Sequence, residues 1–354
     1  MPNSTSETHN MTINGSASNN VVLITGAAGW LGGILGDALL ADDPSTQLIL
    51  ADIVEPRPPK AAPNAVTIKA DLSDTAAIDG LFTTRLGVPG TIYCLHGIMS
   101  RGSEDNFDLG MRINVDSIRA VLNRARTEAE NGVPPIKFIF TSSLAVYGGP
   151  LPDVVGPSTI ATPEGSYGCG KLMSELLVNE YTRRGFVDGR ILRLPTIVVR
   201  PGPPSNATSA FISGIIREPL SGQEAVCPVG DSLSSSALDE LAAWVASPET
   251  TIRNFVIARH VPADKFLPHT RAVYLPGFTT TVRQELEALR EVAGEEALKL
   301  VTFKDDPTNR RIVGSWPARF DNSYPVGLGF VADEGGMVPI VRRFREQLGS
   351  AAKF

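Results

Sequence analysis

Short apolar runs recur through the first 200 residues, and segments with helical spacing separate them. The runs cover residues 21–24, 48–51, 66–68, 91–95, 137–140 and 190–194. Runs of this length, bounded by turn residues, are typical of strands buried on both faces. Helical spacing of apolar residues is found at 30–40, 110–130 and 174–184, the last continuing a helix that begins near residue 167. This alternation predicts an α/β fold with a doubly wound parallel sheet.

The pattern changes after residue 200. The run Arg200-Pro201-Gly202-Pro203-Pro204 cannot continue a helix or a central strand. We expect residues 200–280 to be rich in loops, with helices again at 281–292 and 340–348. The chain therefore divides into a disordered tail (1–20), a main domain (21–200) and a smaller region (201–354), some segments of which return to the sheet.

Composition excludes several classes of function. The formal net charge is −6 and there is no basic block, so we expect no nucleic-acid partner. No apolar run is long enough to span a bilayer, and the start of the chain lacks a secretory signal, so a cytoplasmic location is expected. Cys94, Cys169 and Cys227 are widely spaced and are expected to be small buried side chains. The four histidines lack ligand spacing, and no metal is expected.

Three glycines follow the first apolar run at intervals of three: Gly26, Gly29 and Gly32. Glycines between a strand and a helix let the backbone approach a pyrophosphate, and the helix start at Trp30 and Leu31 offers free N–H groups. Asp52 stands 20 residues after Gly32, at the end of the second run. Its carboxylate can bind ribose hydroxyls and repel a 2′-phosphate. The sequence thus predicts a Rossmann domain that binds NAD in preference to NADP.

Tyr167 and Lys171 stand four residues apart in a predicted helix and share one face. A lysine ammonium near a tyrosine favours the phenolate, which can act as a base. Ser143 follows the fifth run and can donate to a substrate oxygen, while Asn114 is expected to position Lys171 through a backbone carbonyl or a water. Alone, a Tyr-Lys pair is more often a surface pair; with Ser143 and the glycine turn it predicts proton transfer. Cys169, turned about 200° from Tyr167, is expected to pack and not to react.

These residues resemble the extended short-chain dehydrogenase/reductase superfamily. The matching pieces are Thr25-Gly26-x-x-Gly29-x-x-Gly32, Asp52, Asp71-Leu72, Asn114, Ser143 with Val146-Tyr147-Gly148, and Tyr167-x-x-x-Lys171. Further segments within 108–114, 148–155, 193–202 and 213–220 are similar to the D-erythronate dehydrogenase family, a sugar-acid branch close to the nucleotide-sugar epimerases. The resemblance implies oxidation of C2 of a four-carbon hydroxy acid with NAD. It makes Tyr167 the base, Lys171 its activator and Ser143 the donor on the oxyanion side.

The same resemblance extends the cofactor-binding set. It adds Leu95, Pro195 and Thr196 to the glycine loop, Asp52, Tyr167 and Lys171. Asp71, followed by Leu72, is expected with equal weight to lie near the adenine or to be a turn or cap residue.

Candidate substrate residues follow the fourth and sixth runs, where ligands bind at the carboxyl ends of parallel strands. They are Ser100, Arg101, Ser143, Thr196, Arg200 and Arg217; the last, like Asn206 and Ser209, is placed by resemblance alone. Arg101 suits a carboxylate, although a solvated loop position is slightly favoured. His96-Gly97, Arg101 and Gly168-Cys169-Gly170 depart from the family pattern, which leaves the substrate open. For Arg193, a structural ion pair inside the sheet is expected as readily as a place in the pocket. Trp244 and Trp316 are expected to be core or interface residues.

Two alternatives stay open. An epimerase of nucleotide sugars or a ketoreductase of a secondary metabolite would share the fold, although residues 202–222 show no basic cluster for a diphosphate. A non-catalytic NAD-binding sensor is less expected, because such proteins usually lose the tyrosine or the lysine. A small hydroxy acid or sugar-derived molecule is the expected substrate. The helix after Asn114 and the helix carrying Tyr167 are the expected faces of a homodimer.

Overall fold

The computed structural model describes residues 20–203 and 207–354. The tail predicted over residues 1–20 therefore lies, apart from Asn20, outside the described residues, as does Asn206. Within the described ranges, no helix combines the length and the apolar character needed to cross a membrane.

A seven-stranded sheet forms the centre of the molecule, and all of its neighbouring strands run parallel. Its strands are β1 (Val21–Thr25), β2 (Gln47–Asp52), β3 (Val66–Lys69), β4 (Thr91–Cys94), β5 (Ile136–Ser143), β6 (Val187–Leu194) and β10 (Ala272–Tyr274). The spatial order is β10-β6-β5-β4-β1-β2-β3, so the direction of winding reverses between β1 and β4. The predicted doubly wound fold is confirmed, and the six apolar runs match β1 to β6 within a few residues.

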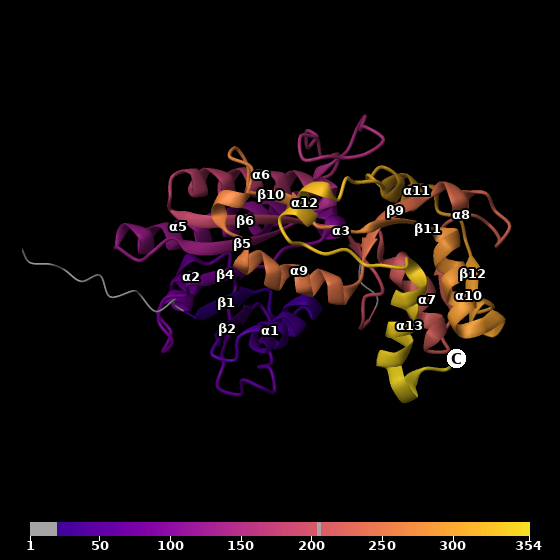
Figure 1. Ribbon diagram of the computed structural model, residues 1–354, viewed down its shortest axis with the longest axis horizontal. Coiled ribbons are helices and arrows are strands. Elements are labelled where there is room, and N and C mark those ends of the chain that lie inside the picture. Colours follow the sequence, from indigo (N-terminus) through magenta and orange to yellow (C-terminus); the bar gives the residue numbers. More distant parts are fainter. Residues whose placement is uncertain (1–19, 204–206) are drawn as a thin grey trace, which may run out of the picture.

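Helices cover both faces of this sheet (Figure 1). In β1, Leu23 belongs to the core formed with α2 (Thr75–Phe82), α5 (Ser117–Glu130) and α6 (Ser166–Arg183). Its neighbours Val22 and Ile24 point to the other face, where α1 (Trp30–Asp42) and α9 (Pro248–His260) pack. Because apolar side chains are buried on both faces, at roughly 25 cal/mol per Å² of apolar surface, the strand ends are held in fixed positions.

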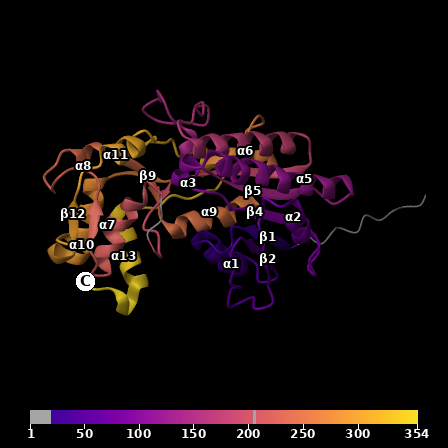
Figure 2. The same ribbon diagram turned by 180° about the vertical axis from the view of Figure 1, so that it is seen from behind.

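Apart from α9 and β10, most elements after β6 build a smaller region next to the carboxyl end of the sheet (Figure 2). Three helices, α7 (Ala210–Leu220), α10 (Val282–Leu298) and α13 (Met337–Leu348), enclose an aliphatic core that includes Ile215, Leu289 and Val341. The remaining helices are α3 (Ser100–Asp105), α4 (Phe107–Met111), α8 (Ala237–Glu240), α11 (Pro307–Gly314) and α12 (Ser323–Gly327). The remaining strands form the sheets β11-β9-β7 and β12-β8, with β7 (Thr196–Ile197), β8 (Ala225–Cys227), β9 (Ala242–Ala246), β11 (Phe278–Thr281) and β12 (Val301–Phe303).

The prediction that residues 200–280 are rich in loops is wrong. This segment contains the long helices α7 and α9 and contributes strands to all three sheets. Helix α9 was missed because its inward face carries the polar side chains Thr251, Asn254 and Arg259, which interrupt the apolar spacing. The helix predicted over 281–292 is α10, which is kinked at Gly294 (φ 81°) before its last turn.

Candidate active site

A cavity of about 290 Å³ lies at the carboxyl end of the central sheet, and most of the predicted site residues meet there. Those that line it are Gly26, Gly29, Trp30, Leu31, Leu95, Ser100, Ser143, Tyr167, Lys171, Pro195, Thr196 and Arg200. The segments after β1, β4, β5 and β6 and the start of α6 deliver these residues. The location is the switch point of the sheet, where ligands of doubly wound folds bind.

The loop after β1 is shaped to accept a phosphate group. Gly26 has a φ of 71°, and a Cβ at this position would lie 2.7 Å from the backbone nitrogen of His96, so only glycine fits. Gly29 is the N-cap of α1, and no side chain caps this helix. The first N–H groups of α1, including those of Trp30 and Leu31, are therefore available to an anion.

Asp52 ends β2 and reaches back to the same loop. Its Oδ2 accepts a hydrogen bond from the Ala28 N–H at 3.0 Å, and its Oδ1 accepts one from the Val54 N–H at 3.5 Å. A carboxylate has about four acceptor sites, so this one retains capacity for ribose hydroxyls. The uncapped helix and the nearby carboxylate together fit the pyrophosphate and ribose of a dinucleotide.

Asp71 and Leu72 follow β3, and neither lines the cavity. Asp71 accepts hydrogen bonds from the N–H and the hydroxyl of Ser73, at 2.9 Å and 2.8 Å, and these bonds lower the pKa of its carboxyl. Leu72 is buried in the core under the sheet. Asp71 therefore makes the contacts of a turn residue, while its place near the adenine stays a prediction.

Close backbone packing brings the end of β5 to the start of α6. Ser143 is followed by a 3₁₀ turn, Leu144–Val146, and its Oγ accepts a hydrogen bond from the Ala145 N–H at 3.1 Å. A Cβ on Gly168 would lie only 1.9 Å from the Ala145 carbonyl oxygen, so only glycine lets the helix approach this closely. The approach brings the hydroxyls of Ser143 and Tyr167 into hydrogen-bonding contact. The close approach of α6 to Ala145 explains why a glycine stands at position 168, where the motif departs from the family pattern.

Desolvation shifts the pKa values of both Tyr167 and Lys171. Burial raises the pKa of Tyr167 to about 12, while the Ser143 hydrogen bond and the positive charge of Arg200 oppose that rise. Burial lowers the pKa of Lys171 to about 8. The Lys171 Nζ donates to the Thr141 carbonyl at 2.8 Å and lies 5.7 Å from the centroid of the Tyr167 ring. Sequence reasoning assigned the activating charge to Lys171 alone and gave Arg200 only a place near the substrate.

Asn114 lies in a π-helical turn, Arg112–Asp116, that leads into α5. Its buried amide binds the backbone of Ile98 at both ends: Oδ1 accepts from the N–H at 2.9 Å, and Nδ2 donates to the carbonyl at 3.0 Å. Its own carbonyl accepts from the Ser174 hydroxyl at 2.7 Å, whereas Lys171 donates to the Thr141 carbonyl. The alternative link from Asn114 to Lys171 through a water stays a prediction. Asn114 also holds the loop after β4, which forms one wall of the cavity.

His96 stands where a small residue was expected, and sequence reasoning missed its structural role. Its Nδ1 lies 2.8 Å from Thr25 Oγ1, and its Nε2 lies 2.8 Å from Ser117 Oγ. The Ser117 hydroxyl donates to the Ile113 carbonyl at 2.6 Å, so it accepts from Nε2 of the imidazole. Burial lowers the pKa of His96 to about 3, which keeps the ring neutral. The imidazole therefore joins β1 to the helix that follows Asn114.

A second cavity, of about 510 Å³, adjoins the first. Both are lined by Ser100, Ala145, Tyr167 and Trp316, so Tyr167 stands at their junction. The charged side chains around the second cavity are Arg101, Glu104, Asp105, Glu164, Asp306 and Arg311. Among the described residues that line the first cavity, the only charged ones are Lys171 and Arg200.

Arg200 is half-buried in the wall of the first cavity. Its Nε donates to the Ile197 carbonyl at 3.3 Å, and its Nη2 donates to the Ser209 hydroxyl at 3.4 Å. Ser209 and Thr196 line the same cavity. Burial is the main cause that lowers the pKa of Arg200, followed by the charge of Arg217.

The other two predicted arginines lie elsewhere. Arg217 lines neither cavity; it donates to the Arg200 carbonyl at 2.9 Å and pairs with Glu218 at 2.6 Å, so it supports Arg200 from behind. Arg101 lies on α3 rather than in a loop, at the second cavity. Its side chain is 70% exposed and pairs with Asp105 at 2.8 Å.

Comparison with known proteins agrees with this geometry. A family model described as the NAD dependent epimerase/dehydratase family matches residues 22–236. The chain belongs to this family. Two D-erythronate dehydrogenases, from Haemophilus influenzae and Cupriavidus necator, are each 41% identical to it, over 88% and 93% of this chain and 95% and 99% of their own lengths. A crystal structure described as the nucleoside-diphosphate-sugar epimerase from Agrobacterium tumefaciens shares 34% identity, with a TM-score of 0.85 over 94% of this chain and 95% of that chain.

Membership of the epimerase/dehydratase family confirms the resemblance drawn from the motifs. It also confirms the predicted class, an NAD-dependent dehydrogenase acting on a CH–OH group, and implies NAD(P) as the cofactor.

Behind the site of this family member, Arg193 makes the predicted structural ion pair. Its Nη2 lies 2.6 Å from Glu175 Oε2, and its Nη1 donates to the Tyr147 hydroxyl at 2.6 Å. Ser142 also donates to Glu175. These contacts connect β5, β6 and α6, the elements that carry the serine, tyrosine and lysine of the site.

The remaining predictions concern tryptophans and cysteines. Trp244 is buried, as predicted, and also lines the first cavity, whereas Trp316 lines both cavities, which the sequence did not indicate. Cys94 and Cys227 are buried as predicted. The expectation that Cys169 packs is wrong: it is exposed, because it lies on the face of α6 that points away from the sheet.

Proposed function

We propose that the protein oxidises the C2 hydroxyl of a small sugar acid, such as D-erythronate, to the 2-keto acid with NAD. The observation that carries this proposal is one cavity in which a phosphate-binding glycine loop meets a serine, a tyrosine and a lysine. The 41% identity to two D-erythronate dehydrogenases over most of both chains supports the same reaction.

The residues at the carboxyl edge fit the parts of NAD. The N–H groups at the start of α1 would bind the pyrophosphate, Asp52 the adenosine ribose and Lys171 the nicotinamide ribose. Leu95, Pro195 and Thr196 would border the nicotinamide. The charge of Asp52 favours NAD over NADP, because a 2′-phosphate would meet this carboxylate. When bound, the cofactor supplies the acceptor for the hydride that leaves C2.

The side chains of the cavity handle the hydroxyl proton. Ser143 accepts a hydrogen bond from the Ala145 N–H, so its own proton remains for donation, to Tyr167 in the structure and to the substrate oxygen when a substrate is bound. Tyr167, as phenolate, takes the proton while the carbonyl forms. The Ser143 hydrogen bond and Arg200 lower the pKa of Tyr167, and the nearby ammonium of Lys171 adds a further positive charge.

Formation of NADH, followed by its absorbance, tests the reaction directly. The panel holds small hydroxy acids, with D-erythronate and L-threonate first, and NAD and NADP are compared side by side. We expect turnover of a four-carbon acid with NAD preferred. No turnover of any acid by a protein that binds NAD would reject the proposal.

One observation favours a second candidate, an epimerase of nucleotide sugars. The 34% identical crystal structure carries that description. Against it, the described lining of the first cavity offers only Lys171 and Arg200 as cations, and the second cavity has more acids than arginines. A diphosphate would need further positive charge. Conversion of a nucleoside-diphosphate sugar without net NADH formation would decide for this candidate.

We also propose a homodimer in which α5 and α6 pair across a two-fold axis. Helix α6 exposes Met173 and Leu176, and the neighbouring α4 exposes Phe107. A symmetric interface would cover these apolar side chains. Sedimentation should show a dimer for the wild type and a monomer for Leu176→Glu. A wild-type monomer would contradict this proposal.

A further inference from the structure

We propose that Arg200 binds the carboxylate of the substrate in the first cavity, and that the hydroxylated remainder of the acid extends past Tyr167 into the second cavity. This inference rests on the proposed dehydrogenase function. It adds the orientation of the substrate and the class that the site selects, which is anionic 2-hydroxy acids with a hydroxylated tail.

Arg200 differs from three arginines of the protein interior in having no carboxylate partner among the described residues. The interior pairs are Arg190 with Asp188, Arg193 with Glu175, and Arg217 with Glu218. The partners of the Arg200 guanidinium are neutral, a backbone carbonyl and a hydroxyl, and its Nη1 has no partner within the described chain. A desolvated charge without a counter-charge is unfavourable, and a substrate carboxylate would supply the missing charge.

The charges of the two cavities favour one orientation of an acid. Two cations and no acidic side chain line the first cavity within the described residues. Four acidic side chains and two arginines line the second, and one of those arginines, Arg101, is already paired with Asp105. A carboxylate is therefore attracted to the first cavity and repelled by the second.

The position of Arg200 selects the carbon that is oxidised. Arg200 lines the first cavity together with Tyr167 and Ser143. In a 2-hydroxy acid, the carboxylate and the reacting hydroxyl are on adjacent carbons. A carboxylate bound to Arg200 therefore directs the neighbouring hydroxyl to Tyr167 and Ser143.

The second cavity is suited to the rest of the acid. Two of its acidic side chains already accept hydrogen bonds within the protein: Glu104 accepts from the Ser166 N–H at 3.0 Å, and Asp306 caps α11. Its lining also includes the neutral polar side chains Thr208, Thr308 and Asn309, which match the donors and acceptors of a polyol. With a volume of about 510 Å³, this cavity has room for a tail longer than that of a four-carbon acid.

The test compares D-erythronate with its uncharged amide. In Arg200→Met we expect the ratio of kcat/KM for the acid to that for the amide to fall on the order of a hundredfold, with partial recovery in Arg200→Lys. The ratio removes any effect of Arg200 on Tyr167, because that effect is common to both substrates. Arg290→Met, on the outer face of α10, is the matched control and should keep the wild-type ratio. An unchanged ratio in Arg200→Met, or a fall in Arg101→Met instead, would overturn the inference.

A binding measurement separates this inference from the proposed function. If the wild type oxidises no hydroxy acid, the proposed function fails, and calorimetry of D-erythronate with the protein and NAD still tests Arg200. Binding that is lost in Arg200→Met supports the inference. Equal binding in both proteins, or no binding to the wild type, overturns it.

A second variant tests the place of the tail. Thr308→Trp narrows the second cavity at α11, away from Arg200. We expect kcat/KM to fall at least about tenfold more for a six-carbon aldonate than for glycerate, which has a tail of one carbon. An equal change for both acids would overturn the second half of the inference.

Discussion

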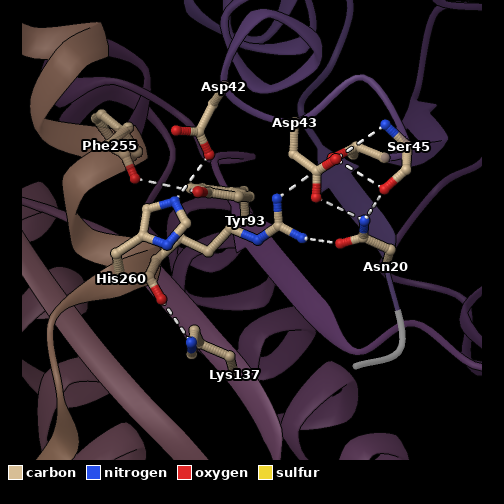
Figure 3. Close-up of polar contacts among 10 residues, drawn as sticks. Asn20, Asp42, Asp43, Ser45, Tyr93, Lys137, Phe255 and His260 are labelled. Atoms are coloured by element: carbon tan, nitrogen blue, oxygen red, sulfur yellow. Dashed lines mark hydrogen bonds and ion pairs between the residues drawn. The ribbon is translucent and has the colours of Figure 1, made fainter. Parts of the chain in front are cut away.

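The two ends of the central sheet differ in how far their polar side chains are paired with one another. At the amino end, the side chains form a network of mutual partners (Figure 3). Asn20 donates to Asp43 at 2.7 Å and accepts from Arg259 at 2.7 Å, and His260 lies 2.7 Å from Asp42. These contacts connect the start of β1 with the ends of α1 and α9.

The C-terminus of α9 lies at the centre of this network. The last carbonyl groups of a helix have no partners within it, and here side chains of the sheet donate to them. Lys137 donates to the Arg259 carbonyl, and Arg190 donates to those of Ala258 and Val261. Tyr93 donates to the Phe255 carbonyl, one turn before the helix end. Cations at this end also interact favourably with the helix dipole.

At the carboxyl end, polar groups are left short of partners. Among the described residues, Arg200 has no carboxylate partner, and the buried Thr141 Oγ1 has no hydrogen-bond partner. Burial raises the pKa of Tyr167 to about 12 and lowers that of Lys171 to about 8. Mutual pairing therefore stabilises the fold at one end, while the groups at the other end lack protein partners and suit contact with a ligand.

The largest effect on stability is expected from Arg190→Met at the amino end. Loss of the guanidinium leaves two carbonyls of the α9 end and the Asp188 carboxylate without their partner, which should lower the free energy of unfolding by about 3–5 kcal/mol. Denaturant unfolding measures this change. Arg183→Met removes an exposed pair with Glu180 and should leave the free energy of unfolding close to that of the wild type. Unchanged stability in Arg190→Met would contradict the stabilising role of the contacts at the amino end.

The variant Gly168→Ala tests the close approach of α6 to the end of β5 at the carboxyl end of the sheet. The added methyl group would meet the Ala145 carbonyl and push the start of α6 away from Ser143. We expect kcat to fall on the order of a hundredfold, because misplacement of a catalytic group by about 1 Å has that effect. Cys169→Ala, which alters an exposed neighbour in the same helix, should keep wild-type activity. Full activity of Gly168→Ala would show that the close approach is not needed.

The pH dependence of oxidation follows from the shifted pKa values. Tyr167 must lose its proton to act as a base, so the rate should rise with pH, by up to about tenfold per unit. The rise should flatten near pH 8, where Lys171 loses its charge. Reduction of the keto acid should show the opposite slope. Removal of a positive charge in Arg200→Met should move the profile to higher pH, and a rate of oxidation that falls with pH would contradict the role of Tyr167.

The smallest expected effect concerns a group that is unpaired but far from both cavities. Glu285 is buried, burial raises its pKa well above the ordinary value, and its Oε2 has no partner among the described residues. The folded state therefore holds a proton that the unfolded chain releases, so stability falls as pH rises above the ordinary pKa. Glu285→Gln should raise the free energy of unfolding by about 1 kcal/mol near pH 8 and leave it unchanged near pH 4. An equal effect at both pH values would exclude this cause.

The sheet and the phosphate loop could be predicted because their signals are local. An apolar run, a glycine such as Gly26 and an acid such as Asp52 occur in the order in which a strand, a turn and a second strand need them. Tyr167 and Lys171 also carry a local signal, since their spacing places both on one face of a helix. These features depend on residues that are neighbours in the chain.

The remaining features depend on contacts between distant segments. Helix α9 has buried polar residues because their partners lie on other elements: Asn254 binds the backbone of Val331, and Arg259 binds Asn20. The structural role of His96 depends on its contact with Ser117, which lies 21 residues away in the sequence. Arg200 is a candidate carboxylate-binding residue because it lacks a carboxylate partner among the described residues. The lack of a partner depends on the fold and has no local signal in the sequence.

The variant Tyr167→Phe is the strictest test of Tyr167 as the base. NADH formation from D-erythronate and the affinity for NAD are measured on the same preparations of the wild type and the variant. We expect kcat to fall on the order of a thousandfold while NAD affinity and the melting temperature stay close to wild type. Turnover by Tyr167→Phe at the wild-type rate would contradict the assignment of Tyr167 as the base.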